Sequence, residues 1–216
     1  MTGLRGVPPG RAGRIWLVER LHAAERAADL LDRKLRVLRA EQRRRHEAAE
    51  GTDAEWRARW RDAETWLLRA AVLGGQRAIR LAEPARPVDV EIGWTVVMGV
   101  SYPVDAVVHW DPPTQDAVAP GNTALARAVT AYQQALEAAA RHAVARAAVQ
   151  RIDAEVATTR RRLRAVRSRW IPRLTASLHD TEIALEEMEH ADGIRLRWAA
   201  GRQGADEETP TGIDSK

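Results

Sequence analysis

Proline is unevenly distributed along this chain of 216 residues, and the gaps between prolines restrict its fold more than any other feature. None lies between Pro9 and Pro84, and none lies between Pro120 and Pro172. Because a proline inside a helix removes a backbone hydrogen bond and clashes with the preceding turn, these gaps are where long helices can form. The spans on either side of the proline-rich middle would form helices about 105 and about 115 Å long, at about 1.5 Å per residue.

The composition favours extended helices over a thick globular core. Phenylalanine is absent, tyrosine occurs twice, 45% of the residues are apolar and 30% are charged. The sequence contains no run of 18 uncharged apolar residues, so we expect no segment that spans a bilayer. The first residues lack the apolar segment of a secretory signal. The absence of cysteine excludes disulfides, thiolate nucleophiles and Cys-ligated zinc, and it fits a cytosolic protein.

The net charge of +4 does not by itself indicate a nucleic-acid-binding protein. Acidic residues alternate with arginines through most of the chain, as in Glu19-Arg20 and Glu25-Arg26. A nucleic-acid-binding protein is expected to gather its basic residues on one face, whereas interleaved charges are typical of solvated helix faces.

Apolar residues in both long spans recur at alternating steps of three and four, which is typical of the seam of a left-handed coiled coil. An ordinary helical bundle would need a wider apolar face. Residues 51–53 favour a local irregularity or a break in the first span. In the second span the pattern begins at Leu125, Val129, Tyr132 and Leu136. The predicted seam residues are Leu17, Leu21, Leu31, Leu35, Leu38, Ile152, Val156, Leu163, Val166 and Trp170.

In the middle of the chain the apolar period changes to two. Residues 88–98 and 104–110 alternate between apolar and small or polar residues, and a connection containing Gly and Pro, residues 99–103, separates them. This pattern predicts two half-buried strands that form a hairpin. Because an isolated hairpin is marginally stable, we expect it to lean on the inner ends of both helices.

The expected fold is mainly α: a long antiparallel coiled coil of N- and C-terminal helices, with a small head containing a β-hairpin at the bend. Asn122, which follows Pro120 and Gly121, is expected to cap the second helix. The predicted parts are an N-terminal extension (1–10), a first coiled-coil helix (11–83), the head (84–121), a second coiled-coil helix (122–198) and a disordered tail (199–216).

Motifs for catalysis and cofactor binding are missing from the sequence. Gly74-Gly75 lacks the lysine of a phosphate-binding loop, so it indicates helix fraying or close packing. His190 has Glu186 and Glu187 at metal-ligand spacing, but two acids and one histidine are common on a solvated helix face. We therefore expect no enzyme active site, no cofactor and no metal.

The densest feature of the sequence is a run of seven arginines within residues 159–173. Contact with a phosphate backbone is one interpretation. The other is the solvent side of a coiled-coil helix, because Leu163, Val166 and Trp170 continue the seam. Pro172 within this helical pattern predicts a kink or a lost hydrogen bond, at a propensity cost of about 3 kcal/mol.

The same run resembles the C-terminal signature T-R-R-R-[VL]-x-A-[LV]-x(4)-I-P-R-L of the D subunit of V-type (A/V-type) ATPases and ATP synthases. Met98-Gly99-Val100 followed by Pro103 resembles the M-G-V-x-x-P of that family's central hairpin, and residues 10–34 are similar to its opening helix. The chain departs from the family where Arg164 and Arg167 stand in place of asparagine and glutamate. The residues in register with the signature are Thr159, Arg160, Arg161, Arg162, Ala165, Ile171, Pro172 and Leu174.

The resemblance implies a non-catalytic central rotor subunit without a cofactor. In the family, the paired helices insert into a hexamer of A and B subunits, and the head binds the F subunit and docks on the C subunit above the membrane ring. It implies a cytoplasmic protein at the inner face of the membrane that binds no nucleic acid. The alternative is an arginine-rich coiled coil that binds nucleic acid or acts as a scaffold. The predicted partner-binding residues of the head are Val90, Ile92, Trp94, Met98, Gly99, Pro103 and Val108.

Overall fold

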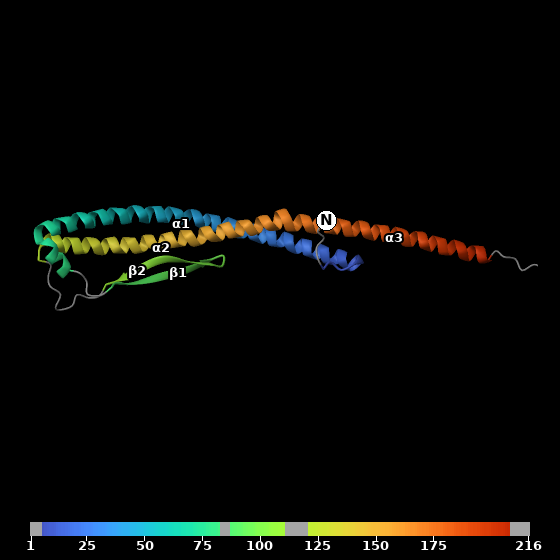
Figure 1. The fold of residues 1–216 in the computed structure, drawn as a ribbon, viewed down its shortest axis with the longest axis horizontal. Helices are drawn as coiled ribbons and strands as arrows, with labels where there is room; N and C mark the ends of the chain where they lie inside the picture. The colour runs from blue at the N-terminus through green and yellow to red at the C-terminus, as the bar shows by residue number, and fades with distance from the viewer. Residues whose placement is uncertain (1–5, 83–86, 111–120, 208–216) are drawn as a thin grey trace, which may run out of the picture. The chain divides into compact units, whose positions relative to one another are not determined.

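The computed structural model describes residues 6–82, 87–110 and 121–207, and of residues 199–207 it describes the backbone. Its elements are helix α1 (Gly10–Leu81), strands β1 (Asp89–Val97) and β2 (Val100–His109), helix α2 (Thr123–Ala165), a π-helical turn η1 (Val166–Trp170) and helix α3 (Ile171–Glu207) (Figure 1). The expected fold class is confirmed, because long helices with a coiled-coil arrangement accompany one antiparallel β-hairpin. The chain divides into two compact units, residues 32–161 and residues 1–31 with 162–216.

Within the unit of residues 32–161, alanine rather than leucine fills much of the contact between α1 and α2. Ala63 packs with Ala131 and Ala135, and beside them lie Trp66 and Tyr132. Small side chains let two helix backbones approach closely, so little apolar volume is needed to bury the contact. The predicted seam through Leu136 is therefore wrong here: Leu136 is 40% exposed, and the buried stripe runs through the neighbouring alanines.

Helix α1 continues through residues 51–53, where the sequence favoured an irregularity. The hydroxyl of Thr52 donates a hydrogen bond to the carbonyl oxygen of Ala49 over 3.0 Å, which keeps the side chain within the helix. Trp56, one turn further on, stacks on His142 of α2 with ring centroids 5.4 Å apart. Two side chains from this part of α1 therefore take part in local packing without a break in the helix.

The break in α1 lies at Gly75, whose φ of 66° and ψ of 176° are not helical. After this break, Ala78 and Ile79 pack against the first turns of α2. A side chain at Gly74 would meet the amide nitrogen of Asn122 at 2.8 Å, which supports the close-packing interpretation of the glycine pair. Asn122 caps α2 as predicted, because its Oδ1 accepts a hydrogen bond from the backbone N–H of Leu125 over 2.8 Å.

The hairpin has a tighter turn than predicted. Met98 and Gly99 both adopt positive φ, 51° and 79°, and Val97 pairs directly with Val100. Such a two-residue turn matches the twist of the flanking strands, so residues 100–103 belong to β2 and not to a connection. The pairing shifts between Gly93 and Trp94, at a bulge in which β2 has one extra residue.

In the other unit, ion pairs join the first part of α1 to α3. Leu17 and Ala28 are buried on α1, and Leu163 and Leu174 are buried on the C-terminal helices. Exposed ion pairs join Arg11 to Glu189 over 2.8 Å and Arg14 to Glu182 over 3.1 Å, which fits an antiparallel register. Helix α3 continues to Glu207, beyond the predicted helix end at residue 198, and residues 208–216 lie outside the described part.

Pro172 produces a wider turn in place of a sharp kink. The backbone N–H of Ile171 bonds to the carbonyl oxygen of Val166, five residues earlier, so residues 166–170 form a π-helical turn. A proline cannot donate the next hydrogen bond, and a wider turn relieves the clash of its ring with the preceding carbonyl. The wider turn also rotates the residues that follow relative to an unbroken α-helix. This explains why Trp170, a predicted seam residue, is instead 55% exposed.

Candidate functional site

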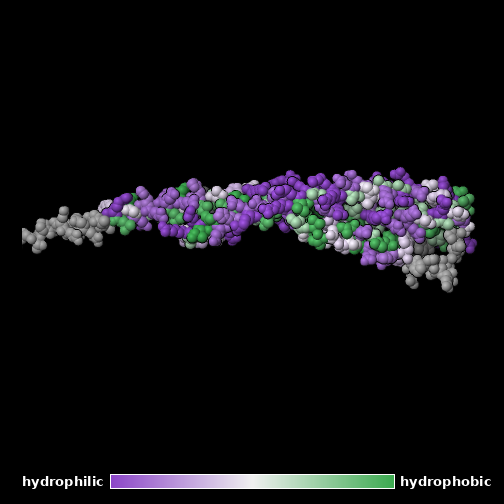
Figure 2. Space-filling model, turned by 180° about the vertical axis from the view of Figure 1, so that it is seen from behind, coloured by the Kyte–Doolittle hydropathy of each residue, from purple (hydrophilic) through white to green (hydrophobic). Residues whose placement is uncertain are grey.

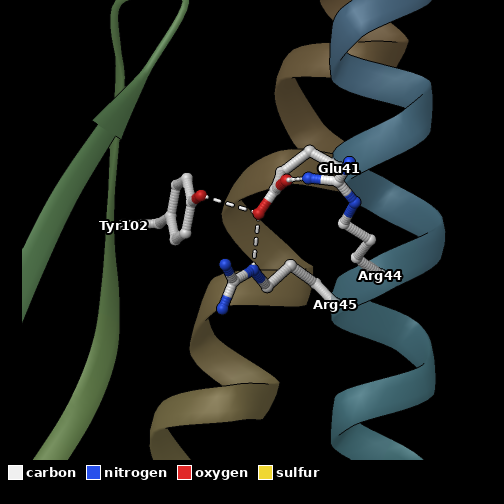
Figure 3. A network of polar contacts seen from close by, with 4 residues as sticks. All are labelled: Glu41, Arg44, Arg45 and Tyr102. Atoms are coloured by element: carbon white, nitrogen blue, oxygen red, sulfur yellow. Dashed lines mark hydrogen bonds and ion pairs between the residues drawn. The ribbon is translucent and has the colours of Figure 1, made fainter.

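The hairpin is attached to α1 through a buried carboxylate (Figure 3). Glu41, which is 7% exposed, accepts a hydrogen bond from the hydroxyl of Tyr102 over 2.8 Å and one from Nε of Arg45 over 2.7 Å. Arg44 contacts its second oxygen at 3.4 Å, and the guanidinium of Arg45 lies 5.1 Å from the centre of the Tyr102 ring. Tyr102 is itself 1% exposed, so this group closes the contact between β2 and α1. We call these four residues the Glu41 cluster.

The cluster stabilises the ionised form of Glu41. Burial alone would raise the pKa of Glu41, but hydrogen bonds from Arg45 and Tyr102 and the charges of Arg45 and Arg44 outweigh it, so its pKa lies below the usual value of 4.5. Burial and the hydrogen bond to Glu41 raise the pKa of Tyr102 above 10.0, against the opposing charge of Arg45. The arrangement therefore holds a charged acceptor and a neutral hydroxyl donor, which suits attachment and not proton transfer near neutral pH.

Helix α2 holds the other side of the hairpin. The guanidinium of Arg151 lies 4.9 Å from the centre of the Trp94 ring, and its Nη1 donates a hydrogen bond to the carbonyl oxygen of Ser101 over 3.3 Å. The indole N–H of Trp110 donates to Glu137 over 3.0 Å. These contacts correct the predicted position of the hairpin, which lies along the middle of α1 and α2 and not at their inner ends (Figure 1).

The point where the hairpin is attached to α1 lies far from the bend between α1 and α2. Glu41 precedes the break at Gly75 by 34 residues, which corresponds to about 50 Å of helix at about 1.5 Å per residue. The sequence could not supply this position, because period-two alternation predicts a strand but does not indicate which helix surface accepts it.

Most of the predicted partner-binding residues of the hairpin are available at its surface. Val90, Ile92, Trp94 and Met98 are exposed, while Pro103 is buried and Val108 is half-buried. Gly99, in the turn, is exposed. Three apolar residues outside the prediction, Val96, Val104 and Val107, are exposed as well. On the face shown in Figure 2, hydrophobic residues form separate patches within a mainly hydrophilic surface.

The predicted seam residues have different degrees of burial. Leu21, Leu31 and Val166 are half-buried, and Trp170 is exposed. The remaining predicted seam residues are buried: Leu17, Leu35, Leu38, Ile152, Val156 and Leu163.

The signature residues combine one buried polar contact with an exposed arginine surface. Thr159 is buried, and its hydroxyl donates a hydrogen bond to Oε1 of Glu155. The same oxygen accepts a hydrogen bond from the ammonium group of Lys34 over 2.7 Å. Arg160, Arg161 and Arg162 are exposed, as is Pro172. Ala165 and Ile171 are half-buried and Leu174 is buried, so these three residues contribute to packing.

The described residues offer little for small-molecule or metal chemistry. A cavity of ≈ 130 Å³ lies between the hairpin and the helices, and Arg45, Thr52, Asp105 and Arg141 are among its lining residues. Ligand pockets usually measure about 300–1,000 Å³, so it is too small for a nucleotide. Within the described ranges, no group of three or more His, Asp or Glu side chains could hold a metal ion, and no helix could cross a membrane. Glu186, Glu187 and His190 are exposed.

The Glu41 cluster is the contact that sequence reasoning missed. Glu41 stands three residues after the seam residue Leu38 and is followed by Gln42, Arg43, Arg44 and Arg45. A carboxylate on the seam side of a helix, with three arginines within the next four residues, is a signal of a buried ion pair. The sequence did not indicate its partner in the hairpin, because Tyr102 was assigned to the connection.

Two comparisons with known proteins cover most of the chain. Residues 15–201 match the family model described as the D subunit of ATP synthase. The V-type ATP synthase D subunit of Thermotoga neapolitana is 28% identical to this chain over 193 residues, which cover 88% of this chain and 95% of that relative.

Proposed function

The chain belongs to the family of ATP synthase D subunits, and on this basis we propose that it is the central rotor shaft of a V-type (A/V-type) ATPase or ATP synthase. The match over residues 15–201 is the observation that carries the proposal, because it includes both long helices and the hairpin. Family membership supports a stalk subunit of a rotary ATPase. The transmission of torque between a catalytic hexamer and a membrane ring is the part we propose.

The local physical chemistry is compatible with such a shaft. A rod that transmits torque must resist twisting, and paired helices with buried Leu38 and Ile152 provide a continuous packed contact within residues 32–161. The outer faces are rich in charge, and exposed ion pairs contribute only about 0–1 kcal/mol each. Such a surface can exchange contacts with a surrounding protein without becoming locked to it.

The partners follow from this role. We propose that the paired N- and C-terminal helices enter a hexamer of A and B subunits, and that the F subunit binds at the exposed face of the hairpin. The C subunit would then receive the bend between α1 and α2, on the cytoplasmic side of the membrane. In this proposal the chain performs no chemistry of its own, and hydrolysis or synthesis of ATP takes place in the A and B subunits.

The test is co-expression of an affinity-tagged chain with the A, B, F and C subunits from the same organism. We expect A, B and F to be recovered with the chain in constant proportion. We also expect the coupling of ATPase activity to rotation of the membrane ring to require the chain. Recovery of the chain without A and B would overturn the proposal. Recovery with duplex DNA in their place would favour the nucleic-acid-binding alternative.

A hairpin deletion tests the assignment of partners to regions. Replacing residues 88–110 with a Gly/Ser linker should weaken binding of F or lower coupling, while A and B still capture the helices. The matched control keeps the hairpin and changes Leu68, which is exposed on α1, to Ala. If the deleted chain no longer binds A and B, the hairpin does not have the role proposed for it.

A further inference from the structure

One face of the hairpin gathers its carboxylates. Because side chains alternate along a strand, Asp89 and Glu91 of β1 lie on the same face as Gly93. Gly93 pairs with Asp105 of β2, and residues that pair directly across two strands share a face, so Asp105 lies on it as well. All three carboxylates are exposed, and Val107, which pairs with Glu91, is 49% exposed. We call Asp89, Glu91, Asp105 and Val107 the acidic face.

The acidic face keeps a net negative charge. Asp89 and Asp105 accept hydrogen bonds from the backbone N–H groups of the residues that follow them, over 2.9 and 2.8 Å. Glu91 lies 3.2 Å from Nε2 of His109. In the part of the chain that the structure describes, none of the three carboxylates forms an ion pair with a lysine or an arginine. Residues 87–110 contain neither of these cations.

A stretch of the C-terminal helices carries the opposite charge. Residues 156–179, which we call the arginine-rich stretch, contain seven arginines and no aspartate or glutamate. Arg169 and Arg173 are exposed one turn apart, and Trp170 between them is 55% exposed. Through most of the chain acidic residues interleave with arginines, so this stretch differs from an ordinary solvated helix face.

We infer that the acidic face of one copy of this chain docks on the arginine-rich stretch of a second copy. Two acidic faces would place carboxylates against carboxylates, and two arginine-rich stretches would place guanidinium groups against each other. Such contacts between like charges are unfavourable, so the complementary pairing is the contact between copies that these charges favour. The exposed side chains of Val107 and Trp170 add apolar area to the two surfaces, while the charges set the orientation.

The contact joins two different surfaces, and each copy carries one of each. Copies therefore associate either as a closed pair with two equal contacts or as an open chain. A nucleic acid would use the arginine-rich stretch alone, and its phosphates would be repelled by the acidic face. The inference concerns the chain outside any complex, so it does not rest on the proposed function.

The experiment is sedimentation velocity of the purified, nuclease-treated full-length chain over a range of protein and sodium chloride concentrations. The wild type should associate at low salt as its concentration rises. It should become monomeric at high salt, because salt screens the attraction between exposed charges. A wild type that stays monomeric under all these conditions would overturn the inference.

Two double variants locate the contact. Asp89→Lys with Glu91→Lys reverses charges on the acidic face, and Arg169→Glu with Arg173→Glu reverses charges on the arginine-rich stretch. Each should weaken self-association by about tenfold or more, because like charges then meet. An equimolar mixture of the two should associate again, because the first variant keeps its arginine-rich stretch and the second keeps its acidic face. This recovery also shows that both variants are folded.

Matched controls make the same changes in net charge at exposed positions of α1. They are Glu19→Lys with Glu25→Lys, and Arg26→Glu with Arg39→Glu. Self-association of both controls should stay within about twofold of the wild type, because an isolated exposed charge contributes little. Helicity by circular dichroism should be the same in all four variants, since every changed side chain is exposed.

Four further results would contradict the inference. Either reversed variant could associate as strongly as the wild type, or the mixture of the two could stay monomeric; both would mean that these surfaces do not meet. Equal losses in the controls would mean that net charge alone governs association. Association that disappears on nuclease treatment would mean that the arginine-rich stretch binds a nucleic acid. Because no other subunit is present, failure of the inference leaves the rotor proposal to its own co-expression test.

Discussion

The hairpin and the arginine-rich stretch have opposite charges, and they relate to the rest of the fold in opposite ways. Residues 87–110 contain three carboxylates and no lysine or arginine, whereas residues 156–179 contain seven arginines and no carboxylate. The hairpin is held to α1 by one buried carboxylate, Glu41. Residues 160–162, 164, 167, 169 and 173 are instead exposed arginines on a helix that packs through other residues.

This difference separates two uses of charge in one chain. A buried charge that is fully paired fixes the position of a structural element, because removal of either partner leaves the other without compensation. An exposed charge contributes little to the fold, because solvent screens its interactions. The same pair of residue types, arginine and glutamate, should therefore respond very differently to substitution in the two regions.

The largest effect is expected from Glu41→Ala. The change leaves the hydroxyl of Tyr102 buried without its acceptor and Arg45 without its carboxylate, which should reduce the stability of hairpin docking by about 3 kcal/mol. Because an isolated hairpin is marginal, amide hydrogen exchange in residues 89–109 should accelerate.

The matched control for this prediction is Glu189→Ala, which removes the carboxylate from the exposed ion pair with Arg11. Its side chain is 62% exposed, so the change should alter stability by less than about 0.5 kcal/mol. Equal effects of the two substitutions would mean that burial does not distinguish the two kinds of ion pair in this chain.

Tyr102→Phe should have a smaller effect than Glu41→Ala. It keeps the buried ring and its contact with Arg45 but removes the hydrogen bond to a charged acceptor, a loss of about 1.5 kcal/mol. The measurement is again hydrogen exchange in residues 89–109, together with the thermal midpoint by circular dichroism. An exchange rate in the hairpin that matches that of the wild type would show that the hydroxyl does not hold the strand.

Acid should weaken the docking of the hairpin through Glu41. Its pKa is below 4.5 in the folded chain, so its contribution is fully present above about pH 4.5 and is lost as the pH falls through the lowered value. In Glu41→Gln the part of the acid sensitivity that comes from this carboxyl should disappear. We would compare thermal midpoints of the two chains from pH 7 down to pH 3, and parallel curves would contradict the assignment.

The sequence predicted the helices and strands better than it predicted their contacts. Proline positions and apolar period placed the long helices and the hairpin, and the cap at Asn122 followed from local chemistry. The buried stripe of α2 differs from the predicted one, which ran through Leu136. Alanines carry little hydrophobic signal in the sequence, but they let the two helices approach more closely than Leu136 would. Periodicity indicates which residues share a face, but side-chain size decides which face is buried.

The candidate site was predicted less completely for a similar reason. Alternation placed Ile92 and Trp94 in a strand but predicted a half-buried face for it, whereas both side chains are exposed. Glu41 and Tyr102 were missed because their pairing joins residues 61 positions apart, and no local pattern indicates a contact at that separation. Trp170 was assigned to the seam because the π-helical turn at residues 166–170 shifts the register in a way that a constant helical period cannot represent.

The smallest effect on the fold is expected from changing Arg161, Arg164 and Arg167 together to Gln. All three are exposed, so the thermal midpoint should change little, with a stability change below about 1 kcal/mol. In a rotor these arginines meet protein groups in succession, and each contact has to be weak and replaceable. The complex with A and B should therefore still assemble, with a modest loss of turnover or coupling.

A nucleic-acid-binding protein would instead lose about one unit of salt slope for each lost phosphate contact. Titrating the wild type and the triple variant against duplex DNA at several salt concentrations separates the two functions. Tight, steeply salt-dependent DNA binding that collapses in the variant, with assembly unaffected, would mean that the exposed arginines serve a nucleic acid, and the rotor assignment would fail.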